Sequence, residues 1–411
     1  MTLFRSTQFA SAAASGHDWR ECSKKVLEAL ESARTKEDGF NMGLLYITDA
    51  LAEDAASIIT LFRSVTGIEV WTGCVGLGVV GVGEEFVDGP AISAMIGRQE
   101  EGQVKPFFFK GKEAKELQAH MSAWLEEHDP MLVLAHGDPF SDPDPADMLG
   151  TLEKHIGGFV AGGILSSRKQ PVLFGQGACE GGISGLAFDT GIPVATGLSQ
   201  GCAPIGGEHE ITKADEHVIL ELDGRRAFDV FTESLRALTI EQTGIDPDQI
   251  VVESGQIEDC SDIPKELRAL FEGGVHVAFP VSGSDMKDYM VRNLVGVDPE
   301  DGAIAVSHPV TTGQRIFFVH RSEKIVREDL SHSLVSLRGR VQQEYGAFEP
   351  KGAVYISCAG RAFSGFSGRE GGEMALVREV IGDVPLCGFY AGGEISGGHL
   401  YSYVGVLILF L

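Results

Sequence analysis

The sequence predicts a mixed α/β protein: a layered sandwich of mixed β-sheets with flanking helices, built from repeated β-α-β-hairpin units. The order of buried strand, helix, strand and glycine turn occurs three times along the 411 residues. The 53 glycines fall at turns rather than in runs, which is typical of many short strands with tight connections. Hydrophobic residues make up 43% of the chain, which is enough for a large buried core.

The three copies follow one order of elements. An amphipathic helix at 18–34 and a polar connector at 35–41 precede the first copy. Its predicted elements are a strand at 43–48, a helix at 52–66, and strands at 68–72 and 91–96. Those of the second are 131–136, 146–155, 158–161, 172–175 and 182–188, and those of the third are 353–357, 372–381, 386–391 and 399–410. Because one such unit cannot bury both faces of its sheet, we expect the three to stack through their sheets.

The segment between the second and third copies reads as connecting strands and helices. The predicted strands are 192–198, 218–222, 275–281, 302–307 and 314–319, and the predicted helices are 227–239 and 327–344. A turn at 223–225 follows a strand and precedes a helix, so we place a domain boundary there. The sequence therefore predicts an N-terminal helical extension at 1–41, a first domain at 42–224 and a second domain at 225–411.

Composition disfavours several classes of function. The net charge of −26 repels phosphate backbones and anionic membranes, so we expect neither nucleic acid nor a membrane as a partner. Seven cysteines without a C-x-x-C pair argue against a disulfide framework or a zinc site and fit a reducing compartment. Residues 1–15 lack the apolar segment of a signal peptide, and no run approaches the roughly 20 apolar residues that cross a bilayer. We expect a soluble, cytoplasmic protein without a cofactor.

Two candidate site residues follow the first strand of the third copy. Cys358 stands at the strand end near a guanidinium, which can lower a thiol pKa and raise its reactivity; otherwise it is a small buried hydrophobe. Arg361 lies among glycines, where its guanidinium can grip a carboxylate or phosphate with two hydrogen bonds. The alternative for Arg361 is a structural ion pair with Glu394 or Glu370.

A third candidate follows the last glycine turn. Gly392 and Gly393 let the backbone approach a ligand closely, and Glu394 comes directly after them. The Glu394 carboxylate can bind an ammonium group, so that Arg361 and Glu394 would hold an amino acid at both ends. The alternative is that Glu394 accepts hydrogen bonds from loop N–H groups.

Other motifs point away from catalysis and metal binding. The segment at 136–147 contains a histidine and several aspartates, which suit a divalent ion. A local role explains it better, because Asp144, Pro145 and Asp147 suit the N-cap, N1 and N3 positions of the next helix. The glycine-rich stretch at 365–372 resembles an anion-binding loop or a pocket wall. The sequence contains no G-x-S-x-G, S-x-x-K or H-E-x-x-H, so we assign no catalytic residue and no metal ligand.

The motifs together resemble the FIST N-terminal and FIST C-terminal domains. Those similar to the N-terminal domain lie at 45–49, 73–74, 196–206, 210–212 and 221–224, and those similar to the C-terminal domain at 358–361 and 385–395. The resemblance implies a stand-alone sensory domain pair of bacterial signal transduction that binds small ligands, amino acids or small acids among them, and signals through a partner protein. Ala203 stands where the family often has arginine, which puts an anion contact there in doubt.

The expected ligand pocket lies at the strand ends of the third copy or in an interdomain cleft. The residues expected to line it are Cys358, Arg361, Gly392, Gly393 and Glu394, together with Gln200 and Cys202 from the first domain. Two alternatives stay open at this point. One is an enzyme with Cys358 as nucleophile or Glu394 as general base, and the other is a scaffold that recognises only proteins.

Overall fold

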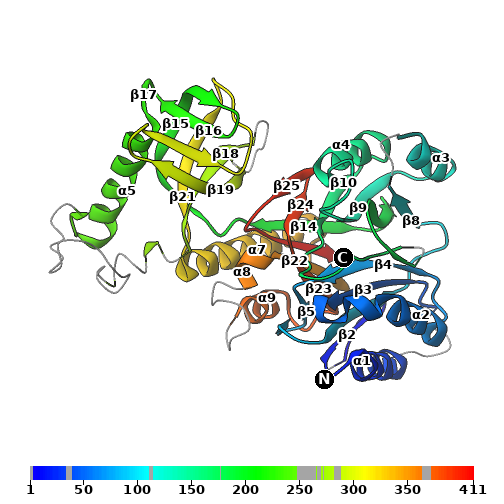
Figure 1. Cartoon of the computed structure of the whole chain (residues 1–411). Helices are drawn as coiled ribbons and strands as arrows, with labels where there is room; N and C mark the ends of the chain where they lie inside the picture. Colours follow the sequence, from blue (N-terminus) through cyan, green and yellow to red (C-terminus); the bar gives the residue numbers. More distant parts are fainter. Residues whose placement is uncertain are drawn as a thin grey trace. The chain divides into compact units, whose positions relative to one another are not determined.

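The structure is a computed structural model that describes residues 3–33, 39–110, 114–175, 177–247, 265, 270–271, 273–281, 288–362 and 372–411. The chain forms two compact units (Figure 1). Unit 1 comprises Met1–Gln200 and Leu330–Leu411, and unit 2 comprises Gly201–Asp329. Helices flank mixed sheets, which confirms the predicted α/β class. These compact units divide the chain at positions other than the predicted domain boundaries. The domains expected from the sequence, at 1–41, 42–224 and 225–411, stay a prediction.

Unit 1 contains three repeats of β-α-β-α-β-β order. The first consists of β2 (Phe9–Ser15), α1 (Trp19–Ala33), β3 (Met42–Thr48), α2 (Ala55–Thr66), β4 (Val70–Gly76) and β7 (Ala91–Gly97). The second consists of β8 (Val104–Phe109), α3 (Ala114–Leu125), β9 (Pro130–Gly137), α4 (Pro145–His155), β10 (Phe159–Ile164) and β13 (Ile183–Asp189). The third consists of β14 (Val194–Ser199), α7 (Glu323–Tyr345), β22 (Gly352–Cys358), α9 (Glu373–Ile381), β23 (Leu386–Ala391) and β26 (Gly405–Phe410).

The pairing of strands is the same in all three repeats. The second and third strands are parallel, as the β-α-β step requires. The fourth strand lies antiparallel to the second and also pairs with the first. The predicted repetition is therefore confirmed, but each repeat is longer than the sequence pattern indicated. Strands β2 and β8 and helix α3 were not predicted, and the predicted strand at 399–410 is two strands.

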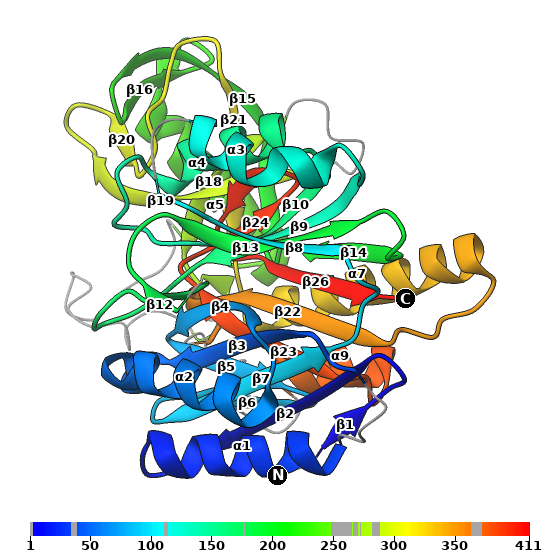
Figure 2. The same cartoon turned by 90° about the vertical axis from the view of Figure 1, so that its right-hand side faces the viewer.

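Each repeat sends a hairpin to the sheet of another repeat. The hairpins are β5 (Gly78–Gly81) with β6 (Glu84–Val87), β11 (Leu173–Phe174) with β12 (Ala178–Cys179), and β24 (Gly393–Ser396) with β25 (His399–Tyr401). Strand β5 pairs with β23, β11 pairs with β4, and β24 pairs with β10. The exchange runs from the first repeat to the third, from the third to the second and from the second to the first. No repeat completes its sheet alone, and the three sheets are tied into one body (Figure 2).

One glycine per repeat permits close contact between the two parallel strands. Gly73, Gly162 and Gly388 stand at matching positions of β4, β10 and β23, each opposite a residue of the preceding parallel strand. A Cβ atom there would lie 1.9, 1.8 and 1.7 Å, respectively, from the carbonyl oxygen of that opposite residue. These distances are far below a van der Waals contact, so the strand pairing requires glycine at all three positions.

Helices cover the outer faces of the sheets in unit 1. Helices α1 and α2 pack on the first sheet (Figure 2) through Val26, Leu30, Ile58 and Phe62. Helices α3 and α4 cover the second sheet in the same way. A short strand, β1 (Phe4–Arg5), extends the first sheet beyond β2. The opposite faces of the sheets are buried as well, which is why their strands read as continuous apolar runs.

Unit 2 is a closed barrel of six antiparallel strands. They are, in spatial order, β15 (Ala203–Asp215), β21 (Arg315–His320), β18 (Val275–Pro280), β19 (Tyr289–Asp298), β20 (Ala303–Val306) and β16 (Val218–Leu222). Strand β16 pairs back with β15 and so closes the barrel, and β17 (Arg225–Arg226) adds a short pair to β16. Helix α5 (Ala227–Thr243) packs Phe231 edge-on against Phe318. In the chain this unit is an insertion between the first strand and the first helix of the third repeat.

Candidate functional site

Strand β22 delivers two candidate residues to the end of its sheet. All seven residues of β22 are buried, and its last residue is Cys358. The single helical turn α8 (Ala359–Ala362) follows at once and turns the Arg361 side chain inward. Arg361 is completely buried, which is rare for arginine and requires a partner of opposite charge.

The partner of Arg361 is Glu373, the first residue of helix α9. Arg361 Nη2 lies 2.6 Å from Glu373 Oε1, and Glu373 is also completely buried. The hydroxyls of Tyr355 and Ser357 donate to the two carboxylate oxygens of Glu373 at 2.7 and 2.8 Å. Arg361 Nη1 donates to the backbone carbonyl of Ser199 at 3.1 Å. The pair is thus held by hydrogen bonds on both sides, and its opposite charges cancel.

The ion pair corresponds in kind to one of the two interpretations of Arg361, with a different acid. The sequence suggested Glu394 or Glu370 as its acid, whereas the structure pairs it with Glu373. Glu370 and the glycine-rich stretch at 365–371 lie outside the described residues. Glu373 begins a helix, where the N-terminal dipole further stabilises its negative charge.

Glu394 lies on β24, the hairpin strand that pairs with β10 of the second repeat. It is completely buried, and its Oε2 accepts a hydrogen bond from the Val404 amide at 3.2 Å. Its Oε1 has no hydrogen-bond partner among the described residues. Burial raises the pKa of Glu394 to about 8, and the Val404 amide, the Arg361 guanidinium and a hydrogen bond from the Cys358 thiol only partly oppose this rise. The carboxyl group is therefore mostly neutral at pH 7.

Tight backbone packing surrounds these side chains. A Cβ on Gly405 would lie 2.4 Å from the Tyr355 hydroxyl oxygen and 3.3 Å from Arg361 Nη1. A Cβ on Gly360 would lie 2.8 Å from the ring of Tyr403. Tyr403 itself has a φ of +66°, an unfavourable conformation for a residue with a side chain. Gly360 and Tyr403 are half-buried, so this side of the cluster is partly exposed to solvent.

The other predicted residues occupy different surroundings. The Gly392 amide donates to the Ile164 carbonyl at 2.8 Å, and Gly393 pairs with the same residue, so both glycines serve the contact between repeats. Gln200 is the last residue of the first segment of unit 1. Cys202 belongs to unit 2, where its carbonyl accepts a hydrogen bond from the Tyr289 hydroxyl at 2.8 Å. That Gln200 and Cys202 contribute to a ligand site stays a prediction.

Sequence reasoning missed Glu373, Ser199 and Tyr403 and the roles of two strand residues. Tyr355 and Ser357 are the polar side chains of an otherwise apolar buried strand and stand two residues apart. Residues at that spacing point to the same face of a sheet. This pattern signals a buried polar cluster and was present in the sequence.

The aspartate-rich segment after β9 has the local role that the sequence suggested. The Asp144 side chain accepts a hydrogen bond from the Ala146 amide at 2.8 Å, and Pro145 occupies the first turn of α4. His136 is completely buried with Nε2 3.0 Å from the Tyr46 hydroxyl, and burial lowers its pKa to about 3. Among the described residues, no group of three or more histidine, cysteine, aspartate or glutamate side chains can hold a metal ion.

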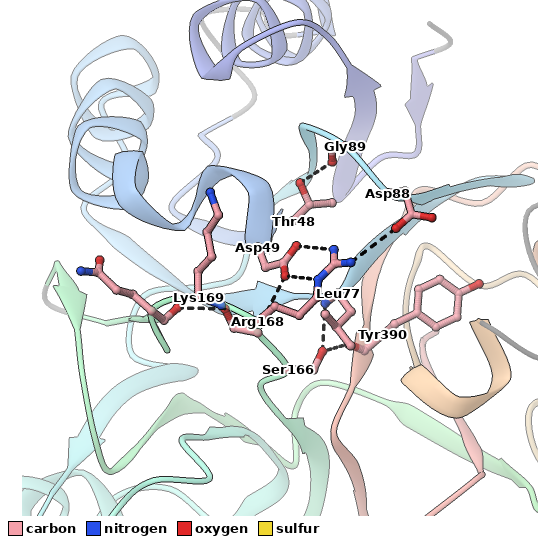
Figure 3. A network of polar contacts seen from close by, with 11 residues as sticks. Thr48, Asp49, Leu77, Asp88, Gly89, Ser166, Arg168, Lys169 and Tyr390 are labelled. Atoms are coloured by element: carbon pink, nitrogen blue, oxygen red, sulfur yellow. Dashed lines mark hydrogen bonds and ion pairs between the residues drawn. The ribbon is translucent and has the colours of Figure 1, made fainter.

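A second polar network joins the three repeats (Figure 3). It starts at Asp49, the first residue of the 3₁₀ turn η1 (Asp49–Asp54) that follows β3. Arg168 Nε and Nη2 donate to the Asp49 carboxylate at 2.7 and 2.9 Å. Burial alone raises the pKa of Asp49, but the hydrogen bonds from Arg168 outweigh it and hold that pKa below its usual value. Ser166 accepts from the Leu77 amide and donates to the Tyr390 carbonyl. The network is satisfied internally and fastens the repeats together.

Comparison with known proteins gives a consistent result along the chain. Residues 41–225 match the model of the FIST N domain, and residues 258–397 match that of the FIST C domain. The uncharacterized protein Rv0628c of Mycobacterium tuberculosis is 28% identical over 355 residues, which cover 82% of this chain and 83% of that protein. The uncharacterized protein Mb0898c of Mycobacterium bovis is 25% identical over 411 residues, covering 95% and 96%. Within the described residues, no helix has both the length and the apolar character to cross a bilayer.

Proposed function

Because this chain belongs to the FIST family, with a FIST N domain followed by a FIST C domain, we propose that it is a ligand sensor. FIST domains are associated with sensing in signal transduction. The ligand is a small polar metabolite, and it binds in unit 1 at the buried cluster of Arg361, Glu394 and Cys358. The output passes to a signalling partner protein.

The unsatisfied oxygen of Glu394 is the observation that carries this proposal. Buried polar atoms in folded proteins nearly always have a hydrogen-bond partner, because an unsatisfied one costs about 1–3 kcal/mol. Glu394 Oε1 is completely buried and has none among the described residues. The strained backbone of Tyr403, one residue before Val404, lies at the same place. Backbone strain and a buried polar atom without a hydrogen-bond partner are together typical of a site that accepts a ligand.

The class of ligand that the resemblance implies is an amino acid or a small acid. A ligand carboxylate would have to share or replace the contact between Arg361 and Glu373. Such a replacement would free Glu373 and the start of α9, which offers one route from ligand binding to a changed surface for the partner protein.

A thermal-shift screen tests the proposal, since a ligand that binds only the folded state raises its stability. Tryptophan fluorescence is the right signal because Trp19, Trp71 and Trp124 all belong to unit 1. A ligand at about 100 times its Kd stabilises by roughly 2.7 kcal/mol, a clear shift of the melting temperature. If amino acids, small acids, amines and neutral polar metabolites all leave the melting temperature of unit 1 unchanged, the sensor proposal is wrong.

A further inference from the structure

We propose that the ligand of the Glu394 cluster is a small amine, bound as its ammonium cation with an N–H group donating to Glu394 Oε1. This inference rests on the proposed function and narrows it to one chemical class. It differs from a clamp that holds an amino acid at both ends, because the two terminal nitrogens of Arg361 already contact Glu373 and Ser199.

The hydrogen-bonding pattern favours a donor over an acceptor as ligand. Both terminal nitrogens of Arg361 are engaged, Nη2 by Glu373 and Nη1 by Ser199. An incoming carboxylate would therefore have to compete with Glu373 and Ser199 for these two nitrogens. Once Glu394 is ionised, by contrast, its Oε1 is an acceptor that has no hydrogen-bond partner among the described residues. A ligand that donates a hydrogen bond completes the cluster without breaking a contact.

The charges around Glu394 favour a cation. The groups that face it are Arg361 from α8, Glu373 from α9, the Cys358 thiol from β22 and Tyr401, its pairing partner on β25. The Arg361 and Glu373 charges cancel at 2.6 Å. Ionised Glu394 would then be an uncompensated buried charge, which burial strongly disfavours.

The charge balance separates the ligand classes. An ammonium ion neutralises ionised Glu394 and leaves the cluster with no net charge. A zwitterionic amino acid leaves one net negative charge if Glu394 ionises, and a carboxylate leaves one even when Glu394 is neutral. Burying uncompensated charge is the most costly of these outcomes, so the single positive charge fits best.

The same balance requires proton release. Glu394 is mostly protonated at pH 7 because burial raises its pKa to about 8. When the ammonium ion binds, the carboxyl group gives its proton to solvent and the carboxylate accepts the ammonium N–H. No other bond forms or breaks. Binding at pH 7 should therefore release about one proton per ligand. Below the pKa of Glu394, the apparent affinity should increase about tenfold for each unit by which the pH is raised.

Two half-buried residues beside the cluster suit such a ligand. The ring of Tyr403 packs against Gly360, both are half-buried, and the same glycine is adjacent to the Cys358 sulfur. Aromatic faces attract ammonium groups. The close packing around Gly360 and Gly405 restricts the ligand to a few heavy atoms unless Tyr403 moves.

The test uses the full chain and three probe series: primary amines (methylamine, ethylamine, ethanolamine), carboxylates (acetate, propionate) and zwitterions (glycine, alanine). Each is screened at pH 7 by the tryptophan thermal shift, and any ligand found is titrated calorimetrically in phosphate and in HEPES. These buffers differ in ionisation enthalpy, so the difference in heat gives the number of protons released. We expect an amine to bind with release of about one proton.

Glu394→Gln is the diagnostic variant. Glutamine keeps the shape and the neutral state of the native group, so the fold should persist, while amine binding should be lost. Glu379→Gln makes the same change at an exposed position of α9 and should leave binding unaltered.

The outcomes separate the two proposals. If a carboxylate or a zwitterion binds and no amine does, or if an amine binds without proton release, the amine inference is overturned and the sensor proposal stands. If no probe of any series shifts the melting temperature, the amine inference is wrong, and the sensor proposal is wrong as well if neutral polar metabolites also leave it unchanged.

Discussion

The buried pair of Arg361 and Glu373 makes a quantitative prediction about the stability of unit 1. Arg361→Met removes the 2.6 Å ion pair and the hydrogen bond to Ser199 but fills much of the same volume. Breaking one side of a buried pair typically costs 3–5 kcal/mol, because the remaining charge stays buried. Two hydroxyls continue to donate to Glu373. We therefore expect the lower end of the range, a loss of about 3 kcal/mol.

A second substitution shows whether the loss of stability comes from the unpaired buried charge of Glu373. Glu373→Gln removes the negative charge and keeps an acceptor oxygen for one of the two hydroxyls, while its amide N–H can donate to the other. The double variant Arg361→Met/Glu373→Gln should therefore be more stable than Arg361→Met alone by about 1.5 kcal/mol or more. Urea unfolding followed by tryptophan fluorescence reads unit 1 alone, because the three tryptophans lie in it. A single variant that loses less than about 1 kcal/mol, or strictly additive effects, would refute the reasoning.

Three further predictions concern the repeats and the carboxyl group. Gly162→Ala places a Cβ 1.8 Å from a backbone oxygen at a φ of +153°, so the free energy of unfolding of unit 1 should fall by about 3 kcal/mol, or the unit should fail to fold. The control Gly150→Ala, at an exposed position of α4, should raise the free energy of unfolding by about 0.5–1 kcal/mol. Because the pKa of Glu394 is raised in the fold, its stabilising effect is complete below about pH 4.5 and is lost as the pH rises through about 8. In Glu394→Gln the difference in the free energy of unfolding between these two pH values should be smaller than in the native protein. An unchanged difference would contradict the idea that burial raises the pKa of Glu394. Arg168→Met leaves a buried carboxylate without its guanidinium partner and should lower the free energy of unfolding by about 1–2 kcal/mol, seen as a lower urea midpoint; no measurable loss would show the network to be dispensable.

Local patterns in the sequence predicted the parts of the fold that depend on local physics. The strand at 353–357 is a continuous apolar run of the length that a doubly buried strand needs, and the structure has β22 there. The glycine turn predicted after the strand at 386–391 lies between β23 and β24, whereas the one predicted at 162–163 is wrong, because both glycines lie inside β10. Strand β2 was missed because its seven residues are mostly alanine and serine, which carry little strand preference.

The exchange of hairpins had no local signature. Strand β11 has only two residues, and its pairing with β4 joins positions about a hundred residues apart. Such long-range pairing is decided by the assembled core rather than by propensity. The same holds for Arg361, since Glu370, Glu373 and Glu394 are all acids within reach along the sequence and only the packing selects Glu373.

The proposed site depends above all on the protonation state of Glu394, which infrared spectroscopy can measure. Infrared difference spectra of the protein between acidic and alkaline pH resolve protonated buried carboxyl groups, and subtraction of the Glu394→Gln spectra assigns the signal. Because Glu394 is buried, we expect a carboxylic acid band that persists at pH 7, disappears with a midpoint near pH 8 and is absent from the variant. A Glu394 signal that titrates near the ordinary glutamate value of about 4.3 would contradict it.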